Sequence, residues 1–247
     1  MVSDLFHTLV YIPLYNALIA LLSMGSFVDV GIAVVSLTVL VKLVLYPLSL
    51  KASRTQQVMR ELEAPMREIR EKYKNDRETQ GKKMLELYRE RGVNPFSGFL
   101  VLLVQLPLIL GLYFVFLKGG LPTIDSSLLY PFITKPTTVS MHFLGFLDMA
   151  SKSYVLAFLA GVTQYFQAHY AMPVLAPRGD TASFQEDFAR SMQVQMKYFL
   201  PIVVAFVAYV ASAAVALYWI TSNMFAIGQE VAVRKKLARE RAQEKAV

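Results

Sequence analysis

The stretch VKLVLYPLSLK, from Val41 to Lys51, has one lysine inside an apolar run that a second lysine ends. Lys42 is the only charge in residues 30–50, and about 20 apolar residues are what a helix needs to cross a bilayer. At about 1.5 Å of rise per residue, Lys42 would lie roughly 13 Å from Lys51, near the middle of a hydrocarbon core about 30 Å thick. The stretch therefore predicts a membrane-spanning helix that carries one intramembrane cation.

The composition of the whole chain is that of a membrane protein. Of its 247 residues, 55% are apolar and 17% are charged, whereas soluble domains carry about 25% charged residues. The absence of cysteine excludes disulfides, thiolate metal sites, cysteine nucleophiles and lipidated cysteines. The three histidines are too scattered to predict a metal site, and the motifs of nucleotide-binding loops, zinc proteases and serine hydrolases do not occur. We therefore expect no enzyme activity, no cofactor and no metal.

Three further runs without charge, 96–117, 153–172 and 198–229, predict more spans. The basic residues concentrate elsewhere, with 21 of the 25 Lys and Arg in the segments 51–91, 178–197 and 234–245. If these segments are cytoplasmic, as the positive-inside rule predicts, the last run must cross the membrane twice because both its ends are cytoplasmic. We therefore predict an all-α integral membrane protein with five transmembrane helices, its amino terminus outside and its carboxyl terminus in the cytoplasm.

The predicted organisation follows from these runs. In chain order it comprises an interfacial amphipathic helix (1–26), span one (27–50), a cytoplasmic helical hairpin (51–93), span two (94–117), an external loop (118–151), span three (152–172), a cytoplasmic loop (173–197), spans four and five (198–231) and a basic cytoplasmic tail (232–247). Residues 5–24 lack a basic start and contain Pro13 and Asn16, so we predict a helix along the outer interface, with a true span as the alternative.

The hairpin segment differs in kind from the spans. Its apolar residues recur every three or four positions, at Val58, Leu62, Met66, Ile69 and Tyr73. This spacing is typical of an amphipathic helix, and the polar run at 74–77 predicts a turn before a second, shorter helix. Because 12 basic residues are mixed with 8 acidic ones, the segment predicts a solvated arm, and we expect no DNA partner.

Lys42 indicates a polar site inside the membrane. A charge there costs on the order of 2.5 to 3.5 kcal/mol. The apolar runs contain no acidic residue, with Glu230 only at the last exit, so we predict a hydrated cavity rather than an ion pair. The predicted groove residues are Thr38, Lys42, Tyr46, Gln105, Gln164, Gln167, Tyr218, Ser222 and Asn223. The alternatives are a lysine that extends to the interface and side chains that bond only between helices.

At these residues the chain resembles the YidC/Oxa/Alb family of membrane protein insertases. Four motifs agree in order, namely Val41–Lys51, MRELEAPMREIREKY (Met59–Tyr73), Gly92–Pro95 followed by Gln105–Pro107, and Leu217–Asn223. The first motif puts Lys42 at the position of the family's groove cation, where arginine is commoner. The second is similar to the first helix of the family's cytoplasmic hairpin, and the resemblance assigns Met59, Pro65 and Tyr73 to that hairpin. The segments Gly98–Val101 and Ala211–Ala213 depart from the family's usual residues.

The resemblance implies a membrane protein insertase and chaperone of the bacterial cytoplasmic (inner) membrane, without the large periplasmic domain that some bacterial members carry. It implies nascent single- or double-span proteins as substrates, which would pass through a cytoplasm-open hydrophilic groove without ATP. Anionic lipids, the ribosome and the Sec translocon are the further candidate partners. A small-solute or ion transporter with a polar intramembrane pathway is the alternative, and Lys42 as general base for a serine nucleophile is a more remote one.

Overall fold

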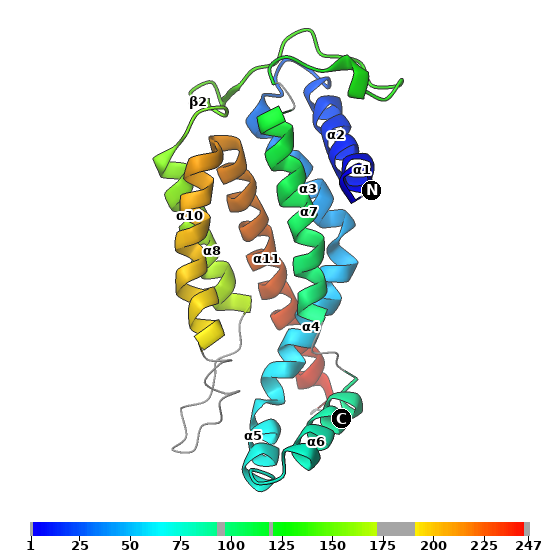
Figure 1. Ribbon diagram of the computed structural model, residues 1–247, viewed down its shortest axis with the longest axis vertical. Helices are drawn as coiled ribbons and strands as arrows, with labels where there is room; N and C mark the ends of the chain where they lie inside the picture. Colours follow the sequence, from blue (N-terminus) through cyan, green and yellow to red (C-terminus); the bar gives the residue numbers. More distant parts are fainter. Residues whose placement is uncertain (1, 93–96, 119–120, 172–190, 245–247) are drawn as a thin grey trace.

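The computed structural model describes residues 2–92, 97–118, 121–171 and 191–244. Its helices are α1 (Val2–Phe6), α2 (Ile12–Leu22), α3 (Val30–Val44), α4 (Tyr46–Glu61), α5 (Glu63–Lys72), α6 (Arg77–Glu90), α7 (Ser97–Lys118), α8 (Tyr154–Ala171), α10 (Leu200–Ala211) and α11 (Ala213–Glu244), with the π-helices η1 (His7–Tyr11) and η3 (Gln195–Phe199), the 3-10 helix η2 (Ser126–Leu128) and the strands β1 (His142–Phe143) and β2 (Leu147–Asp148). The long helices run along one axis (Figure 1). The α5–α6 hairpin lies at one end, the hairpin end, and residues 121–153 lie at the other, the loop end.

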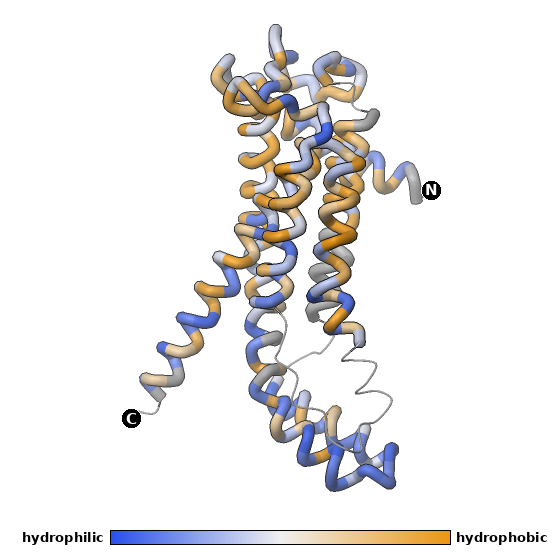
Figure 2. The backbone as a smooth tube through the Cα atoms, turned by 90° about the vertical axis from the view of Figure 1, so that its left-hand side faces the viewer, coloured by the Kyte–Doolittle hydropathy of each residue, from blue (hydrophilic) through white to orange (hydrophobic). Residues whose placement is uncertain are grey.

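Hydropathy divides the molecule along this axis. Figure 2 shows hydrophobic residues along the middle of the bundle and hydrophilic ones in the hairpin and in the last turns of α11. By length and composition, two of the described helical segments can cross a membrane, Asp4–Leu22 and Ser191–Ala211, and the bent pair α3–α4 would make a third. These features fit an all-α membrane protein, while the count of five spans and their orientation stay predictions.

The first predicted span is bent rather than straight. The structure divides the segment 27–50 between α3 and α4, which meet at Leu45 with a bend of 64°. Pro47 lies in the first turn of α4, where its missing amide hydrogen costs no helical hydrogen bond. The predicted groove residues Thr38 and Lys42 therefore lie before the bend, and Tyr46 lies after it.

The amino-terminal segment is one helical stretch attached to the loop end. α1, η1 and α2 follow one another without a break, and they pack against α3 and α7. Asn16 Nδ2 donates to the Leu128 carbonyl at 2.8 Å, and Asn16 Oδ1 accepts from the Tyr130 amide at 2.7 Å. The segment Asp4–Leu22 is long and apolar enough to span a membrane, so the interfacial helix and its alternative, a true span, both stay predictions.

The segment 121–153 is hydrogen-bonded to the starts of two helices. At α3, the Val30 amide donates to the Ser140 carbonyl at 2.9 Å. At α11, the Ala213 amide donates to the Ser151 carbonyl at 2.8 Å. The first amides of a helix have no partner within it, so this segment supplies the acceptors. Within the segment, β1 and β2 pair as a short antiparallel hairpin.

The other half of the bundle consists of α8, α10 and α11. Gly161 of α8 allows a close approach, because the Ala205 Cβ of α10 lies 3.0 Å from the position that a Gly161 Cβ would take. α10 ends at Ala211, and an extended residue, Ser212, leads directly into α11. α11 then continues for 32 residues, so the segments predicted as span five and basic tail form one helix. Its length of about 48 Å exceeds the hydrocarbon core of a bilayer.

The β1–β2 pair is bonded to α3 and packs closely against it. Asp29 Oδ1 accepts from the Ile32 amide at 2.8 Å, and Asp29 Oδ2 accepts from the Leu144 amide at 2.9 Å. Next to this contact, a Cβ added to Gly31 would lie 2.6 Å from the Phe143 Cβ. Since the Phe143 Cβ moves only with its backbone, α3 and β1 meet at a position that suits glycine alone.

Gly31→Ala is expected to lower the free energy of unfolding by about 1–3 kcal/mol, the usual cost of overpacking. The measurement is thermal unfolding of the purified protein in detergent. Gly81→Ala is the matched control, because nothing lies within 4 Å of a Cβ added to Gly81 in α6 and alanine favours a helix. An unchanged Tm for Gly31→Ala would contradict the close approach.

Candidate functional site

Thr38 and Lys42 lie one turn apart on α3, just before the bend. Thr38 is buried, and its Oγ1 donates to the Val34 carbonyl of its own helix at 2.6 Å. Lys42 is half-buried in the last turn of α3. Tyr46 begins α4 on the other side of the bend and is 37% exposed. The predicted cation thus lies where the chain of the first predicted span changes direction.

The predicted residues of α11 are buried between neighbouring helices. Tyr218, Ser222 and Asn223 are all less than a tenth exposed. Asn223 Nδ2 donates to Thr163 Oγ1 of α8 at 3.3 Å, and that hydroxyl donates to the Ala160 carbonyl at 3.0 Å. α11 packs against both α3 and α8, and the bond from Asn223 to Thr163 joins α11 to α8.

The remaining predicted groove residues are placed less completely. Gln164 and Gln167 both lie on α8, where Gln164 Nε2 donates to Gln167 Oε1 at 3.2 Å. Gln105 lies in α7, but its side chain is outside the described part of the structure. That all the predicted residues share one groove therefore stays a prediction.

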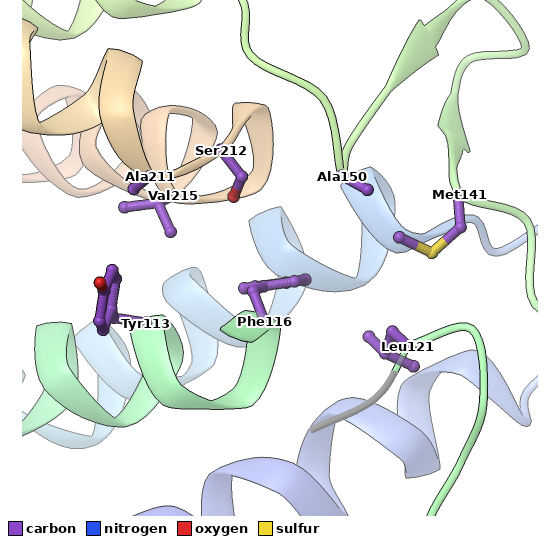
Figure 3. Close-up of a pocket in the computed structure, with 8 residues that line it drawn as sticks. All are labelled: Tyr113, Phe116, Leu121, Met141, Ala150, Ala211, Ser212 and Val215. Atoms are coloured by element: carbon purple, nitrogen blue, oxygen red, sulfur yellow. The ribbon is translucent and has the colours of Figure 1, made fainter. Parts of the chain in front are cut away.

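A small cavity lies at the loop end, between the end of α7 and the α10–α11 turn (Figure 3). Its volume is about 100 Å³, and its lining residues are Tyr113, Phe116, Leu121, Met141, Ala150, Ala211, Ser212 and Val215. The Ser212 hydroxyl is buried and has no hydrogen-bond partner among the described residues. None of the lining residues is among those predicted for the groove, so this cavity is not the predicted site.

The hairpin is held together by polar contacts between α5 and α6. The Tyr88 hydroxyl donates to Met66 Sδ at 3.3 Å, and Gln80 Nε2 donates to the Arg70 carbonyl at 3.1 Å. Burial raises the pKa of the Tyr88 phenol above its usual value, so this hydroxyl keeps its proton at neutral pH.

The three residues assigned to the hairpin do not share one helix. Met59 is near the end of α4, Pro65 is in the first turn of α5, and Tyr73 follows the last residue of α5; all three are half-buried. The break between the two helices is at Leu62, which is 1% exposed. The helix predicted to continue from Met59 to Tyr73 is therefore divided at Leu62.

A polar cluster that the sequence does not predict lies at the hairpin end, between α4 and α11. It contains Ser49, Ser53 and Gln57 of α4 with Gln229, Glu230 and Arg234 of α11. The signal in the sequence is the spacing of Ser49, Ser53 and Gln57, which are four residues apart and therefore share one face of a helix.

The side chains of the predicted groove residues offer recognition rather than bond activation. Hydroxyls, carboxamides and one ammonium group can bind a polar or acidic chain segment through hydrogen bonds and charge. Within the described ranges, no group of three or more His, Asp or Glu side chains is arranged to hold a metal ion.

The sequence matches the family described as 60Kd inner membrane protein over residues 22–240. A membrane protein insertase YidC of Clostridium tetani is 32% identical over 205 residues, which are 83% of this chain and 81% of that relative. A protein of the same name from Francisella tularensis subsp. novicida is 32% identical over 200 residues, which are 81% of this chain and 31% of that relative. The chain thus spans most of the clostridial relative and about a third of the Francisella one.

A double-mutant cycle tests the bond between α8 and α11. Asn223→Leu and Thr163→Val are expected to show a coupling free energy of about 0.6 to 1.7 kcal/mol, the range for hydrogen bonds between membrane helices. The measurement is unfolding in mixed micelles of lipid and SDS. The cycle of Ser222→Ala with Thr163→Val is the control and should be additive. Equal coupling in the two cycles would argue against a direct bond.

Proposed function

The chain belongs to the 60Kd inner membrane protein family, and on that premise we propose that it inserts newly made membrane proteins into the bilayer through a hydrophilic groove beside Lys42. The relatives named membrane protein insertase YidC support an insertase. The observation that carries the proposal of a groove cation is Lys42, half-buried at the end of α3 in an otherwise apolar stretch.

The groove would be open at the hairpin end and closed at the loop end. Lys42 lies in the last turn of α3, on the side of the hairpin end, and polar residues of α11 lie on a neighbouring helix. At the opposite end, the segment 121–153 is hydrogen-bonded to the starts of α3 and α11. This arrangement supports a path that leads water and substrate part of the way across the membrane, without an open pore.

Charge and solvation would drive the substrate's outer tail through this path. An unpaired backbone polar group costs several kcal/mol in hydrocarbon, so water in the groove lowers the barrier for the tail. Lys42 would attract acidic residues in the tail. The membrane potential adds about 2.3 kcal/mol per negative charge for each 100 mV when the outside is positive. These terms together require no ATP.

The apolar segment of the substrate would leave sideways into lipid along α7 and α10. Both helices present large apolar side chains outward, at Leu106 and Leu110 on α7 and at Ile202 and Phe206 on α10. Their exposed fractions lie between 46% and 67%. Lipid stabilises such a segment once it has left the polar part of the protein.

We place the protein in the bacterial inner membrane as a multi-pass protein. α3, α7, α8, α11 and the helix that ends in α10 would be the five spans, with the amino terminus outside. The hairpin and the basic last turns of α11 would then lie in the cytoplasm, as the positive-inside rule requires. There the hairpin would receive nascent chains, and the basic turns would contact anionic lipids and the ribosome, with the Sec translocon as a further partner.

A small-solute or ion transporter is the alternative function. It would use the same polar residues as a pathway open alternately to both sides, and it predicts flux of a small molecule across the membrane. The sequence shows no pair of matching repeats of the kind that many transporters have. The family relationship favours the insertase.

Replacing Lys42 tests the groove cation. In proteoliposomes, Lys42→Arg is expected to insert a single-span protein with an acidic tail at the parent rate. Lys42→Gln and Lys42→Glu should be slower by about tenfold or more, because Coulomb attraction of ~1–4 kcal/mol between close charges is lost or reversed. Protease protection of the tail measures insertion.

Lys51→Gln is the matched control. Lys51 is exposed on α4, so the loss of its charge should change insertion little. Equal insertion by all Lys42 variants would remove Lys42 from the mechanism. A parent protein that inserts no more than empty liposomes would overturn the insertase proposal, and solute-flux assays would then test the alternative.

A further inference from the structure

A buried carboxylate at the hairpin end connects three helices. Glu230 of α11 is 4% exposed. Its Oε1 accepts hydrogen bonds from Gln57 Nε2 of α4 and from Arg234 Nε, the latter at 3.2 Å. Arg234 Nη2 donates in turn to the Tyr170 carbonyl in the last turn of α8. We name the Gln57, Glu230 and Arg234 side chains with the Tyr170 carbonyl the clasp.

A second set of bonds lies beside the clasp, closer to the bend. Ser49 Oγ donates to Gln229 Oε1 at 3.0 Å, and Gln229 Nε2 lies 3.5 Å from Ser53 Oγ. Ser49, Ser53 and Gln57 follow one another at intervals of four residues, so they share one face of α4. Polar side chains on three successive turns therefore hold α4 to α11.

Each polar group of the clasp satisfies a hydrogen-bonding or charge requirement of its neighbour. The last carbonyls of α8 have no partner within the helix, and an arginine satisfies one of them. The Arg234 guanidinium carbon also lies 5.7 Å from the centroid of the Tyr170 ring, within the range of a cation–π contact. A carboxylate as buried as Glu230 is tolerated only when it is paired and hydrogen-bonded, and Arg234 and Gln57 provide this.

The clasp acts on the part of the chain that carries the hairpin. α4 is joined to α3 at the bend and continues into α5 and α6. Hydrogen bonds are directional, so a polar contact selects one orientation of α4, whereas a purely apolar contact would tolerate sliding. The orientation of α4 in turn sets where the hairpin lies relative to the bundle.

We propose that Glu230 is a positioning residue: through Gln57 it holds α4, and with it the hairpin, in the orientation from which a captured substrate enters beside Lys42. The clasp stays closed while substrate passes. This inference rests on the proposed insertase function, and it adds Gln57, Glu230 and Arg234 to the residues on which insertion depends.

The sharpest variant is Gln57→Ala, because it removes the link from α4 to Glu230 and leaves the Glu230–Arg234 pair intact. Thr55→Ala, two residues away on α4, is the matched control. The chain has no cysteine, so spin labels can be attached to Lys74→Cys in the hairpin turn and Met192→Cys on the helix that continues into α10. Pulsed EPR is expected to give one narrow distance distribution for the parent and for Thr55→Ala, and a broadened one for Gln57→Ala.

Insertion by the same variants, without labels, shows whether position matters. Gln57→Ala is expected to lower the initial rate about tenfold or more, the change in population that loss of one hydrogen bond to a buried charged group produces. Glu230→Gln, which keeps the shape but loses the charge, should be slower than the parent, and Thr55→Ala should equal it. A broadened EPR distribution with full insertion would overturn the positioning role, as would an unchanged distribution.

A covalent tether between α4 and α11 tests whether the two helices stay together or have to separate during insertion. Ser53→Cys and Gln229→Cys, introduced together with Gln57→Ala, can be joined by a short reducible bis-thiosulfonate reagent. The tether is expected to restore insertion, and reduction should abolish the rescue. If the tether instead blocks insertion, α4 has to leave α11 during the reaction and the proposal is wrong. Because the EPR measurement needs no substrate, a failure of the parent to insert would count against the insertase function and not against the clasp.

Discussion

The amide groups that begin α3 and α11 are the constraint around which the loop end is built. In an apolar medium an amide without an acceptor costs several kcal/mol, and neither helix can supply one for its own first turn. Carbonyls of the segment 121–153 accept from Val30 and Ala213. Asn16 then fixes the amino-terminal helix to the same segment. One irregular stretch of chain thereby holds together helices that are far apart in the sequence.

Much of this helical architecture follows from the sequence, because apolar runs and their flanking charges determine where helices form. The run beginning near Tyr154 lies in α8, and the run beginning near Val30 is divided between α3 and α4. The segment predicted to cross twice, 198–231, contains the turn between α10 and α11. The sequence does not predict the bend at Leu45. Pro47 is present in the sequence, but proline is also tolerated inside membrane helices, so it does not by itself indicate a bend. The bonds of Asn16 join residues more than a hundred positions apart, and no local pattern contains that information.

The site was predicted as a set of residues rather than as a geometry. Polar residues in apolar runs are conspicuous, so the sequence indicates Thr38 and Asn223. The bond of Thr38 to the Val34 carbonyl is local to its own helix. The partner of Asn223, Thr163 of α8, depends on packing that the sequence does not show. From the sequence alone, Glu230 is only an acidic residue at the end of the last apolar run. Charged residues beside a span usually face water, so its burial became apparent only once α4 lay against α11.

The unbroken length of α11 has a mechanical consequence. α11 has no proline in its 32 residues, the commonest cause of a sharp kink, and it packs against α3 and α8. A sideways load on its last turns, for example from a large particle held there, is transmitted along the rod to the tight turn at Ser212. A backbone that continues from the tight turn to the basic last turns would in this way couple the two ends of the molecule, and a glycine pair placed midway along α11 would uncouple them.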